Sequence, residues 1–305
     1  MSAPVLFHIG YHKTATTWMQ RLLFVPKYGY EQIASHEDVD AHIVAPHGFD
    51  FDPRPMAGMI DEKRRRISNA SVPVVSSEIM SGQPFFGGLS SDVYAQRIKA
   101  IAPDARVLVS IRSQTKILVS CYMQYLLRGG TMSPRQFFEG RRAVEFYAFR
   151  PDHFEYDKLI GYYQNLFGAG NVHVTPQECL ARDANAAAAA IAEFSDNTIF
   201  SGLAAADARV HAKSYPEYAA PILRRINHIQ TSDLNPNPVF SVGQTPYGLY
   251  KLAGYAMKRR PVEAVMKSYR PVTEYVEKTF RGHFTASNKR LRDMLPAHMD
   301  LSAYA

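Results

Sequence analysis

The chain has 305 residues, of which 46% are hydrophobic and 21% are charged, and its formal net charge at pH 7 is +7. This composition supplies a full core and excludes wholesale disorder, because no long segment lacks apolar residues. A basic chain favours an anionic partner such as a nucleotide, an acidic glycan, nucleic acid or an anionic membrane, and the charge alone does not choose among them.

Neither a targeting segment nor a membrane span is visible in the sequence. Residues 1–10 lack the basic and apolar regions of a secretory signal, and no apolar stretch approaches the roughly 20 residues that a bilayer requires. Cys121 and Cys179 form neither a disulfide framework nor a metal-binding motif. We therefore expect two reduced thiols, no transmembrane segment and a cytoplasmic protein.

Short apolar runs alternate with helical patterns along the chain. The run PVLFHI at residues 4–9 predicts a buried strand, and residues 16–24 predict a helix capped by Thr16 or Thr17. In chain order, the further predicted elements are a helix before Ser71 that exposes the basic run 63–66, a strand at 72–76, a helix at 92–102, a strand at 105–111, a helix at 115–127, a strand at 171–175 and a helix at 184–194. Strands separated by helices require crossover connections, so an α/β fold is expected, with a mainly parallel sheet covered on both faces.

A tight loop, Gly10-Tyr-His-Lys-Thr-Ala-Thr-Thr17, joins the first predicted strand to the first predicted helix. A helix N-terminus offers free backbone N–H groups and the positive end of a dipole, so it attracts anions. Lys13 adds a full charge, and the threonines add hydroxyl donors. The loop is therefore a candidate phosphate site, and its alternative is a plain turn with an incidental lysine. A nucleoside triphosphatase loop does not fit, because Lys13 follows Gly10 by only three positions.

A second candidate anion site follows the strand predicted at 105–111. Arg112 stands at the end of that strand, and Ser120 follows eight residues later on the next helix. A guanidinium fork and a hydroxyl group suit a phosphate. The alternative is an arginine in a surface ion pair and a serine on a helix face. Both candidate sites would lie at the carboxyl edge of the sheet, where open α/β sheets bind ligands.

At these motifs the sequence resembles a known family. FHIGYHKTATTWMQ resembles the 5′-phosphosulfate-binding loop of sulfotransferases that use 3′-phosphoadenosine 5′-phosphosulfate (PAPS), and VSIRSQTKILVSCYMQY resembles their 3′-phosphate-binding element. Two further runs show a weaker resemblance. YDKLIGYYQNLFGAGNVHVTPQECL resembles the segment that leads into a later strand of these enzymes, and HFTASNKRLRDMLP resembles the C-terminal helix of many bacterial members. One departure is Ala15, where the family usually has glycine; donor affinity would suffer if the backbone there needs a positive φ.

The resemblance implies one sulfotransferase domain over residues 1–305, with a three-layer α/β/α, P-loop-kinase-like fold and a more helical part from about residue 205. The donor's 5′-phosphosulfate would bind residues 10–17, namely Gly10, Tyr11, His12, Lys13, Thr14, Ala15, Thr16 and Thr17. Its 3′-phosphate would meet Arg112 and Ser120. The product would be adenosine 3′,5′-bisphosphate, and no metal is required, since lysine and backbone dipoles stabilise the bridging oxygen.

Transfer to a hydroxyl group benefits from a base that removes the acceptor proton. Glu78 is the first candidate, because it follows the strand VPVVS and should emerge beside Lys13; its alternative role is to pair with Lys13 or Arg112. His12 is the second candidate. His8 lies inside a strand and is expected to be a satisfied core residue. His36, His42 and His47 lie in the unassigned segment 30–70, and any of them is free to enter the acceptor pocket.

The acceptor is not encoded in any motif, so a small molecule, a glycan or a lipid, anionic or neutral, remains open. Two other functions are left open: a P-loop-like small-molecule kinase and a non-catalytic nucleotide-binding protein. No nucleic-acid module is visible. The segment 247–270 is basic and interleaved with tyrosines, and Arg209 and Lys213 would extend it. It is either a solvated helix face or a surface that attracts an anionic acceptor or an anionic membrane.

Overall fold

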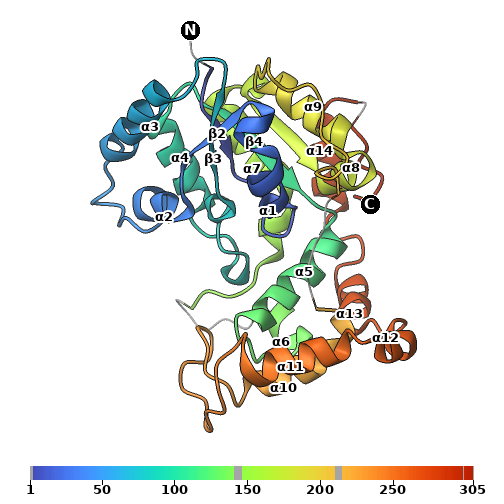
Figure 1. Ribbon diagram of the computed structural model, residues 1–305. Coiled ribbons are helices and arrows are strands. Elements are labelled where there is room, and N and C mark those ends of the chain that lie inside the picture. Colours follow the sequence, from blue (N-terminus) through green and yellow to red (C-terminus); the bar gives the residue numbers. More distant parts are fainter. Residues whose placement is uncertain (1–2, 141–145, 210–214, 298, 305) are drawn as a thin grey trace.

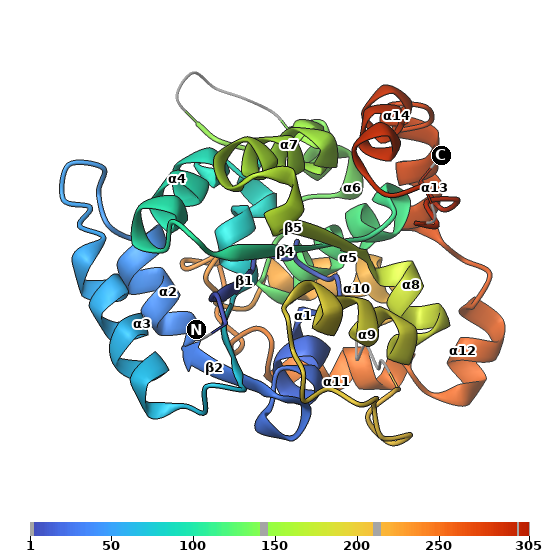
Figure 2. The same cartoon turned by 90° about the horizontal axis from the view of Figure 1, so that it is seen from above.

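A computed structural model describes residues 3–140, 146–209, 215–297 and 299–304. At its centre lies a five-stranded sheet in the order β2-β3-β1-β4-β5, with every neighbouring pair parallel. Helices cover both faces of the sheet (Figures 1 and 2). The predicted three-layer α/β/α architecture is therefore confirmed. The strands are β1 (Leu6–His8), β2 (Tyr30–Ala34), β3 (Val72–Ser76), β4 (Arg106–Ile111) and β5 (Val172–Pro176).

The helices frame the sheet and continue beyond one of its edges. They are α1 (Thr16–Trp18), α2 (His36–Val39), α3 (Arg54–Arg66), α4 (Ser91–Ile101), α5 (Gln114–Leu127), α6 (Pro134–Phe138), α7 (Tyr156–Phe167), α8 (Gln177–Arg182), α9 (Ala184–Phe194), α10 (Ala220–Asn227), α11 (Gly248–Met257), α12 (Arg260–Met266), α13 (Pro271–Thr279) and α14 (Thr285–Met294). The first helix continues beyond α1 as a π-helical segment, Met19–Leu23. Among the described residues, no helix has the length and apolar character to cross a membrane.

Alternating side chains of the strands build the core on the two faces of the sheet. Leu6 and Leu108 face one hydrophobic cluster, which the first helix and α9 complete. Their neighbours Phe7 and Val107 face the opposite and larger cluster, to which α3, α4, α5 and α7 contribute. Successive strand residues point to opposite faces, so a strand covered on both faces is a continuous apolar run. This is why the runs at 4–9 and 105–111 predict their strands correctly.

β2 is the strand that the sequence pattern did not predict. It lies at the edge of the sheet and pairs with β3 alone. Only Tyr30 and Ile33 of its five residues are buried. An edge strand keeps polar residues on its exposed side and so lacks the apolar run that marks a central strand. The strands and helices that were predicted with bounds lie within a residue or two of those bounds, and the basic run 63–66 ends α3, as expected. The predicted cap of the first helix is wrong, because its N-cap is Ala15 and no side chain caps it.

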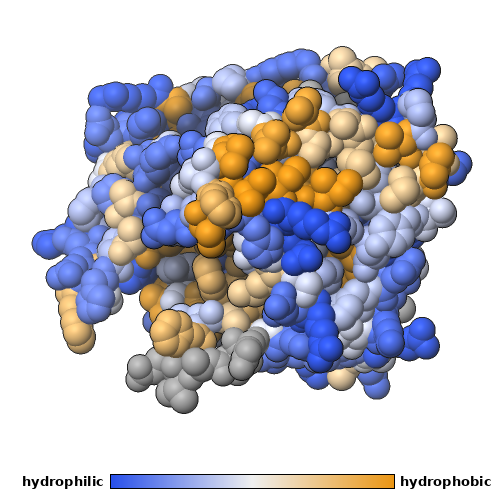
Figure 3. Space-filling view, turned by 90° about the horizontal axis from the view of Figure 1, so that it is seen from below, coloured by the Kyte–Doolittle hydropathy of each residue, from blue (hydrophilic) through white to orange (hydrophobic). Residues whose placement is uncertain are grey.

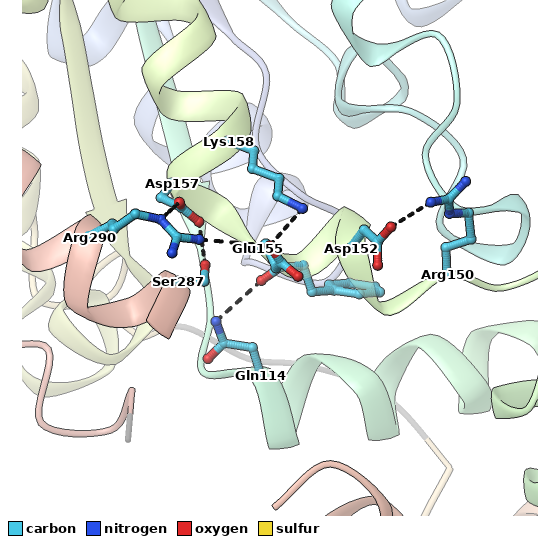
Figure 4. A network of polar contacts seen from close by, with 9 residues as sticks. Gln114, Arg150, Asp152, Glu155, Asp157, Lys158, Ser287 and Arg290 are labelled. Carbon is cyan, nitrogen blue, oxygen red and sulfur yellow. Dashed lines mark hydrogen bonds and ion pairs between the residues drawn. The ribbon is translucent and has the colours of Figure 1, made fainter. Parts of the chain in front are cut away.

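The part of the chain after residue 205 contributes helices and no strand of the sheet, within the described residues. Its last helix, α14, is fixed to α7 by a polar network around the buried carboxylate of Asp157, which accepts from Ser287 Oγ and from Arg290 Nε at 2.5 Å (Figure 4). Gln114 Nε2, at the start of α5, donates to Asn288 Oδ1 at 2.8 Å. The network therefore holds the C-terminal helices against the start of α5, close to Arg112. The number of domains stays a prediction.

Candidate active site

The carboxyl ends of β1, β3 and β4 bring the predicted site residues to one edge of the sheet. β1 lies between β3 and β4, and His8 is in register with Ser76 and Leu108. The chain leaves β1 toward the β2 edge and leaves β4 toward β5, so the two connections diverge here. Such a switch point is where open α/β sheets bind ligands.

A buried polar chain fixes the loop 10–17 to the strands. His8 Nδ1 lies 2.8 Å from Ser76 Oγ and its Nε2 lies 3.0 Å from Ser110 Oγ. Ser110 Oγ in turn lies 2.7 Å from Thr14 Oγ1, which donates to the Tyr11 carbonyl at 2.6 Å. Burial lowers the pKa of His8 to about 4, although the negative charge of Glu78 opposes this shift. His8 is thus the satisfied core histidine that the sequence predicted.

Gly10 is required by close packing. A Cβ atom at this position would lie 1.9 Å from Ser110 Oγ and 2.8 Å from His8 Nε2. Any side chain would therefore break the polar chain that fixes the loop.

The loop itself presents donors around Lys13. Among the described residues, no acceptor is bonded to the backbone N–H groups of Ala15, Thr16 or Thr17, as expected at the start of a helix. Lys13 Nζ donates to Gln124 Oε1 of α5 at 3.1 Å. Burial lowers the pKa of Lys13, and the positive charge of Arg112 lowers it further. Thr16 is buried and Thr17 is exposed. The centroid of the Tyr11 ring lies 4.8 Å from that of the Tyr156 ring, so Tyr11 anchors the loop by aromatic packing.

Arg112 connects the two candidate anion sites. Its Nη1 donates to Ser120 Oγ at 2.8 Å and to the carbonyl of Lys13 at 3.3 Å. α5 begins directly after β4, so Ser120 on this helix lies near the end of the strand. Arg112 and Ser120 therefore meet although they are eight residues apart in the sequence. The carbonyl of Arg112 accepts from Tyr156 Oη at 2.6 Å, and burial lowers the pKa of its guanidinium group.

Glu78 begins the turn that follows β3 and is partly buried. Among the described residues it forms no ion pair with Lys13 or Arg112, whose side chains bond to Gln124 and Ser120. Its negative charge nevertheless acts on His12 and Lys13, since it counteracts part of the fall in their pKa values. His12 Nδ1 is buried without a partner, and burial lowers the pKa of His12 to about 4.

The structure adds His153, which the sequence analysis missed, to the surroundings of His12. The centroid of its ring lies 4.9 Å from that of the Tyr11 ring. The ring also packs against Gly88, where a Cβ atom would lie only 2.0 Å from His153 Nδ1. Its Nε2 is buried without a partner, and burial, reinforced by the charge of His12, lowers its pKa to about 3. Nothing in the local sequence PDHF distinguishes this histidine, because only the fold brings residue 153 to residue 12.

One histidine of the segment 30–70 also reaches this edge. His36 Nδ1 lies 2.7 Å from Ser77 Oγ, directly before Glu78. His42 lies on the π-helical turn Asp40–Val44, and His47 packs against Phe49 in the loop that follows. Of the three histidines left open by the sequence, His36 is therefore the one held beside Glu78.

Ala15 has the left-handed backbone that the sequence analysis identified as unfavourable, with φ 70° and ψ 22°. A residue with a Cβ atom is strained there, whereas glycine is not. The weaker donor affinity expected from this alanine stays a prediction.

Ala15→Gly should therefore raise the free energy of unfolding by about 0.5–1 kcal/mol, the gain expected when strain at a positive φ is relieved. Urea denaturation measures this effect. The matched control is Ala189→Gly in α9, an exposed helix-interior position, which should lose about as much stability. A loss at Ala15 equal to that at Ala189 would contradict the assigned strain.

Two solved structures are similar to this chain, both at low sequence identity. No family model and no curated protein matches the chain. Among solved structures, it is similar to a sulfotransferase from Alicyclobacillus acidocaldarius, with 18% identity, a TM-score of 0.44, and coverage of 75% of this chain and 91% of that chain. It is also similar to mouse sulfotransferase SULT7A1 complexed with PAP, with 11% identity, a TM-score of 0.38, and coverage of 94% of this chain and 88% of that chain. Neither similarity is close enough to assign a function to this chain.

Proposed function

We propose that this protein is a sulfotransferase that transfers a sulfuryl group from PAPS to a hydroxyl group or an amine of an acceptor. One observation supports this most: Arg112 bonds both to Ser120 and to the carbonyl of Lys13. The two candidate anion-binding elements thereby lie side by side at one switch point. A nucleotide with anionic groups at both its 5′ and 3′ positions suits such a pair.

The residues present fit the donor by the chemistry of their groups. The free N–H groups of Ala15, Thr16 and Thr17, with the Lys13 ammonium, suit the 5′-phosphosulfate. For the 3′-phosphate, Arg112 supplies a guanidinium group and Ser120 supplies a hydroxyl group.

In the proposed reaction, the acceptor oxygen or nitrogen forms a bond to sulfur while the bond between sulfur and the 5′-phosphate oxygen breaks. The acceptor proton passes to a base, and the electron pair of the broken bond stays on the phosphate oxygen, giving adenosine 3′,5′-bisphosphate. Lys13 stabilises this oxygen as its charge develops. Its lowered pKa also makes it a better proton donor than an exposed lysine.

Glu78 is our first choice for the base and His12 is the second. Glu78 is partly exposed and lacks an ion-pair partner among the described residues, so its carboxylate is available to an acceptor. His12, with its unpartnered Nδ1, is neutral at pH 7 but is a weaker base than an ordinary histidine, because burial lowers its pKa to about 4. His153 offers a second unpartnered ring nitrogen for positioning the acceptor.

Binding of adenosine 3′,5′-bisphosphate tests the donor assignment. We expect it to bind more tightly than AMP or ATP, because it alone fills both anion sites. Arg112→Ala should weaken the bisphosphate by about 1.5–3 kcal/mol, the usual range for a hydrogen bond to a charged group, and leave AMP nearly unchanged. Isothermal titration calorimetry measures both affinities.

Arg106→Ala is the matched control, since Arg106 begins the same strand at the opposite edge and pairs with Asp196. It should bind both nucleotides as the wild type does. Equal losses of AMP and bisphosphate affinity in Arg112→Ala would remove Arg112 from a 3′-phosphate site, and a preference for ATP would favour a kinase. Incubation with labelled PAPS and a cell extract would identify the acceptor, whether small molecule, glycan or lipid.

A further inference from the structure

Exposed large apolar side chains concentrate in one segment, residues 239–269. Roughly half of all those found among the described residues lie there. They are Val239, Phe240, Val242, Tyr247, Leu249, Leu252, Tyr255, Val265 and Tyr269. This segment comprises the end of the loop before α11, then α11 and α12, which lie on the side of the molecule toward which α5 runs (Figure 1). We call it the basic apolar face.

α11 is apolar on its outer side as well as on its inner side. Its inner side buries Tyr250 and Gly254, and a Cβ atom at Gly254 would lie 2.2 Å from the Tyr215 ring. On its outer side, Leu252 is 67% exposed and Tyr255 is 57% exposed. A helix packed on a soluble core normally places polar residues there. The outer apolar side therefore has no partner within the described chain.

The loop before α11 is closed at its base by backbone hydrogen bonds. Thr231 N donates to the Gly243 carbonyl at 2.9 Å, and Val242 N donates to the Ile229 carbonyl at 2.8 Å. Within the loop that these bonds close, Val239 is 89% exposed and Phe240 is 70% exposed. Because hydrogen bonds close the loop, Val239 and Phe240 are exposed in a folded loop and not in an unstructured segment.

Basic side chains surround the apolar ones. Within residues 247–270 the acidic residue is Glu263 alone, whereas the basic residues are Lys251, Lys258, Arg259, Arg260, Lys267 and Arg270. Arg270 pairs with Glu217 at 3.0 Å; the other five form no ion pair within the described residues. Figure 3 shows this side of the molecule, with a hydrophobic area bordered by strongly hydrophilic side chains. Of the two basic residues expected to extend it, Arg209 is exposed and Lys213 lies outside the described residues.

We propose that the basic apolar face binds the surface of a bilayer that contains anionic lipids. Aromatic and aliphatic side chains at a loop tip and on an outer helix face insert at the boundary of headgroups and acyl chains, while lysine and arginine attract the anionic headgroups. A second copy of the chain fits less well, because a symmetric contact would bring five unpaired positive charges against five others. A soluble acidic polymer would use the charges but leave the apolar side chains in water. This inference does not depend on the proposed function.

Sedimentation of the full chain with lipid vesicles tests the proposal. We expect binding to vesicles of phosphatidylcholine with phosphatidylglycerol, little binding to phosphatidylcholine alone, and weaker binding as salt rises. Arg259→Ser with Arg260→Ser should lower the partition coefficient on the order of 10-fold or more at low salt. Leu252→Ser with Tyr255→Ser should lower it at both low and high salt, because apolar insertion is not screened.

The matched control changes the same amount of charge elsewhere. Lys63→Ser with Arg65→Ser, on the exposed side of α3, should bind vesicles as the wild type does. The proposal would be overturned by a lack of binding to phosphatidylglycerol vesicles, or by wild-type binding in both face variants. Loss of binding in the arginine variant alone would overturn it as well, because it would leave only electrostatic adsorption without apolar insertion. Binding to heparin without binding to vesicles would assign the face to acidic glycans, and self-association in analytical ultracentrifugation would assign it to a second copy.

Discussion

Lys13→Ala should lower kcat on the order of 100-fold or more and change the KM for PAPS by a much smaller factor. The charge of Lys13 matters most when the bridging oxygen becomes anionic, and this happens only in the transition state. Gln124, which accepts from Lys13 Nζ at 3.1 Å, holds the ammonium group at the edge of the loop. Steady-state kinetics with PAPS and an acceptor identified by labelling separates kcat from KM.

Lys63→Ala, an exposed lysine of α3, is the control and should leave both constants unchanged. Lys13→Arg should retain the charge but misplace it, so an intermediate kcat is expected. A rise in KM at constant kcat would make Lys13 a residue for ground-state binding and remove it from the stabilisation of the leaving oxygen.

Glu78→Gln should reduce transfer by on the order of 10²- to 10⁴-fold, the range for loss of a general base, while the affinity for adenosine 3′,5′-bisphosphate stays intact. The amide keeps the size of the side chain but cannot take the acceptor proton. The free energy of unfolding should change little, because the carboxylate of Glu78 has no ion-pair partner within the described residues. Kinetics, calorimetry and urea denaturation of the same preparation distinguish these effects.

His12→Asn and His153→Asn complete this comparison, since each ring has a buried nitrogen without a partner. If Glu78 is the base, both histidine variants should lose less activity than Glu78→Gln. Near-normal transfer by Glu78→Gln together with loss in His12→Asn would make His12 the base. Survival of activity with a fall in stability would leave Glu78 a structural role only.

Local sequence predicts most of the central sheet and the outline of the site. Buried parallel strands are continuous apolar runs, so the runs ending at His8, Ser76 and Ile111 identify their own strands. Residues that follow such runs must gather at the carboxyl edge, which is why Lys13, Glu78 and Arg112 could be grouped before any fold was known. The contact between Arg112 and Ser120 was also accessible, because strand, turn and helix geometry converts the eight-residue spacing into proximity.

What only the tertiary structure decided depends on contacts between segments far apart in the chain. His153 reaches Tyr11 and His12, and Gln124 receives Lys13, without any local pattern that marks either residue. Ala15 has its left-handed backbone in the loop that the polar chain through His8 and Ser110 fixes, and Gly10 is required by that same chain. Which side chains of segment 247–270 are exposed likewise could not be read from its composition, since a basic, tyrosine-rich helix can bury its aromatic rings or expose them. Packing of Tyr250 and Gly254 against Tyr215 uses the inner side of α11 and leaves Leu252 and Tyr255 in solvent, because a helix has only one side to place against a core.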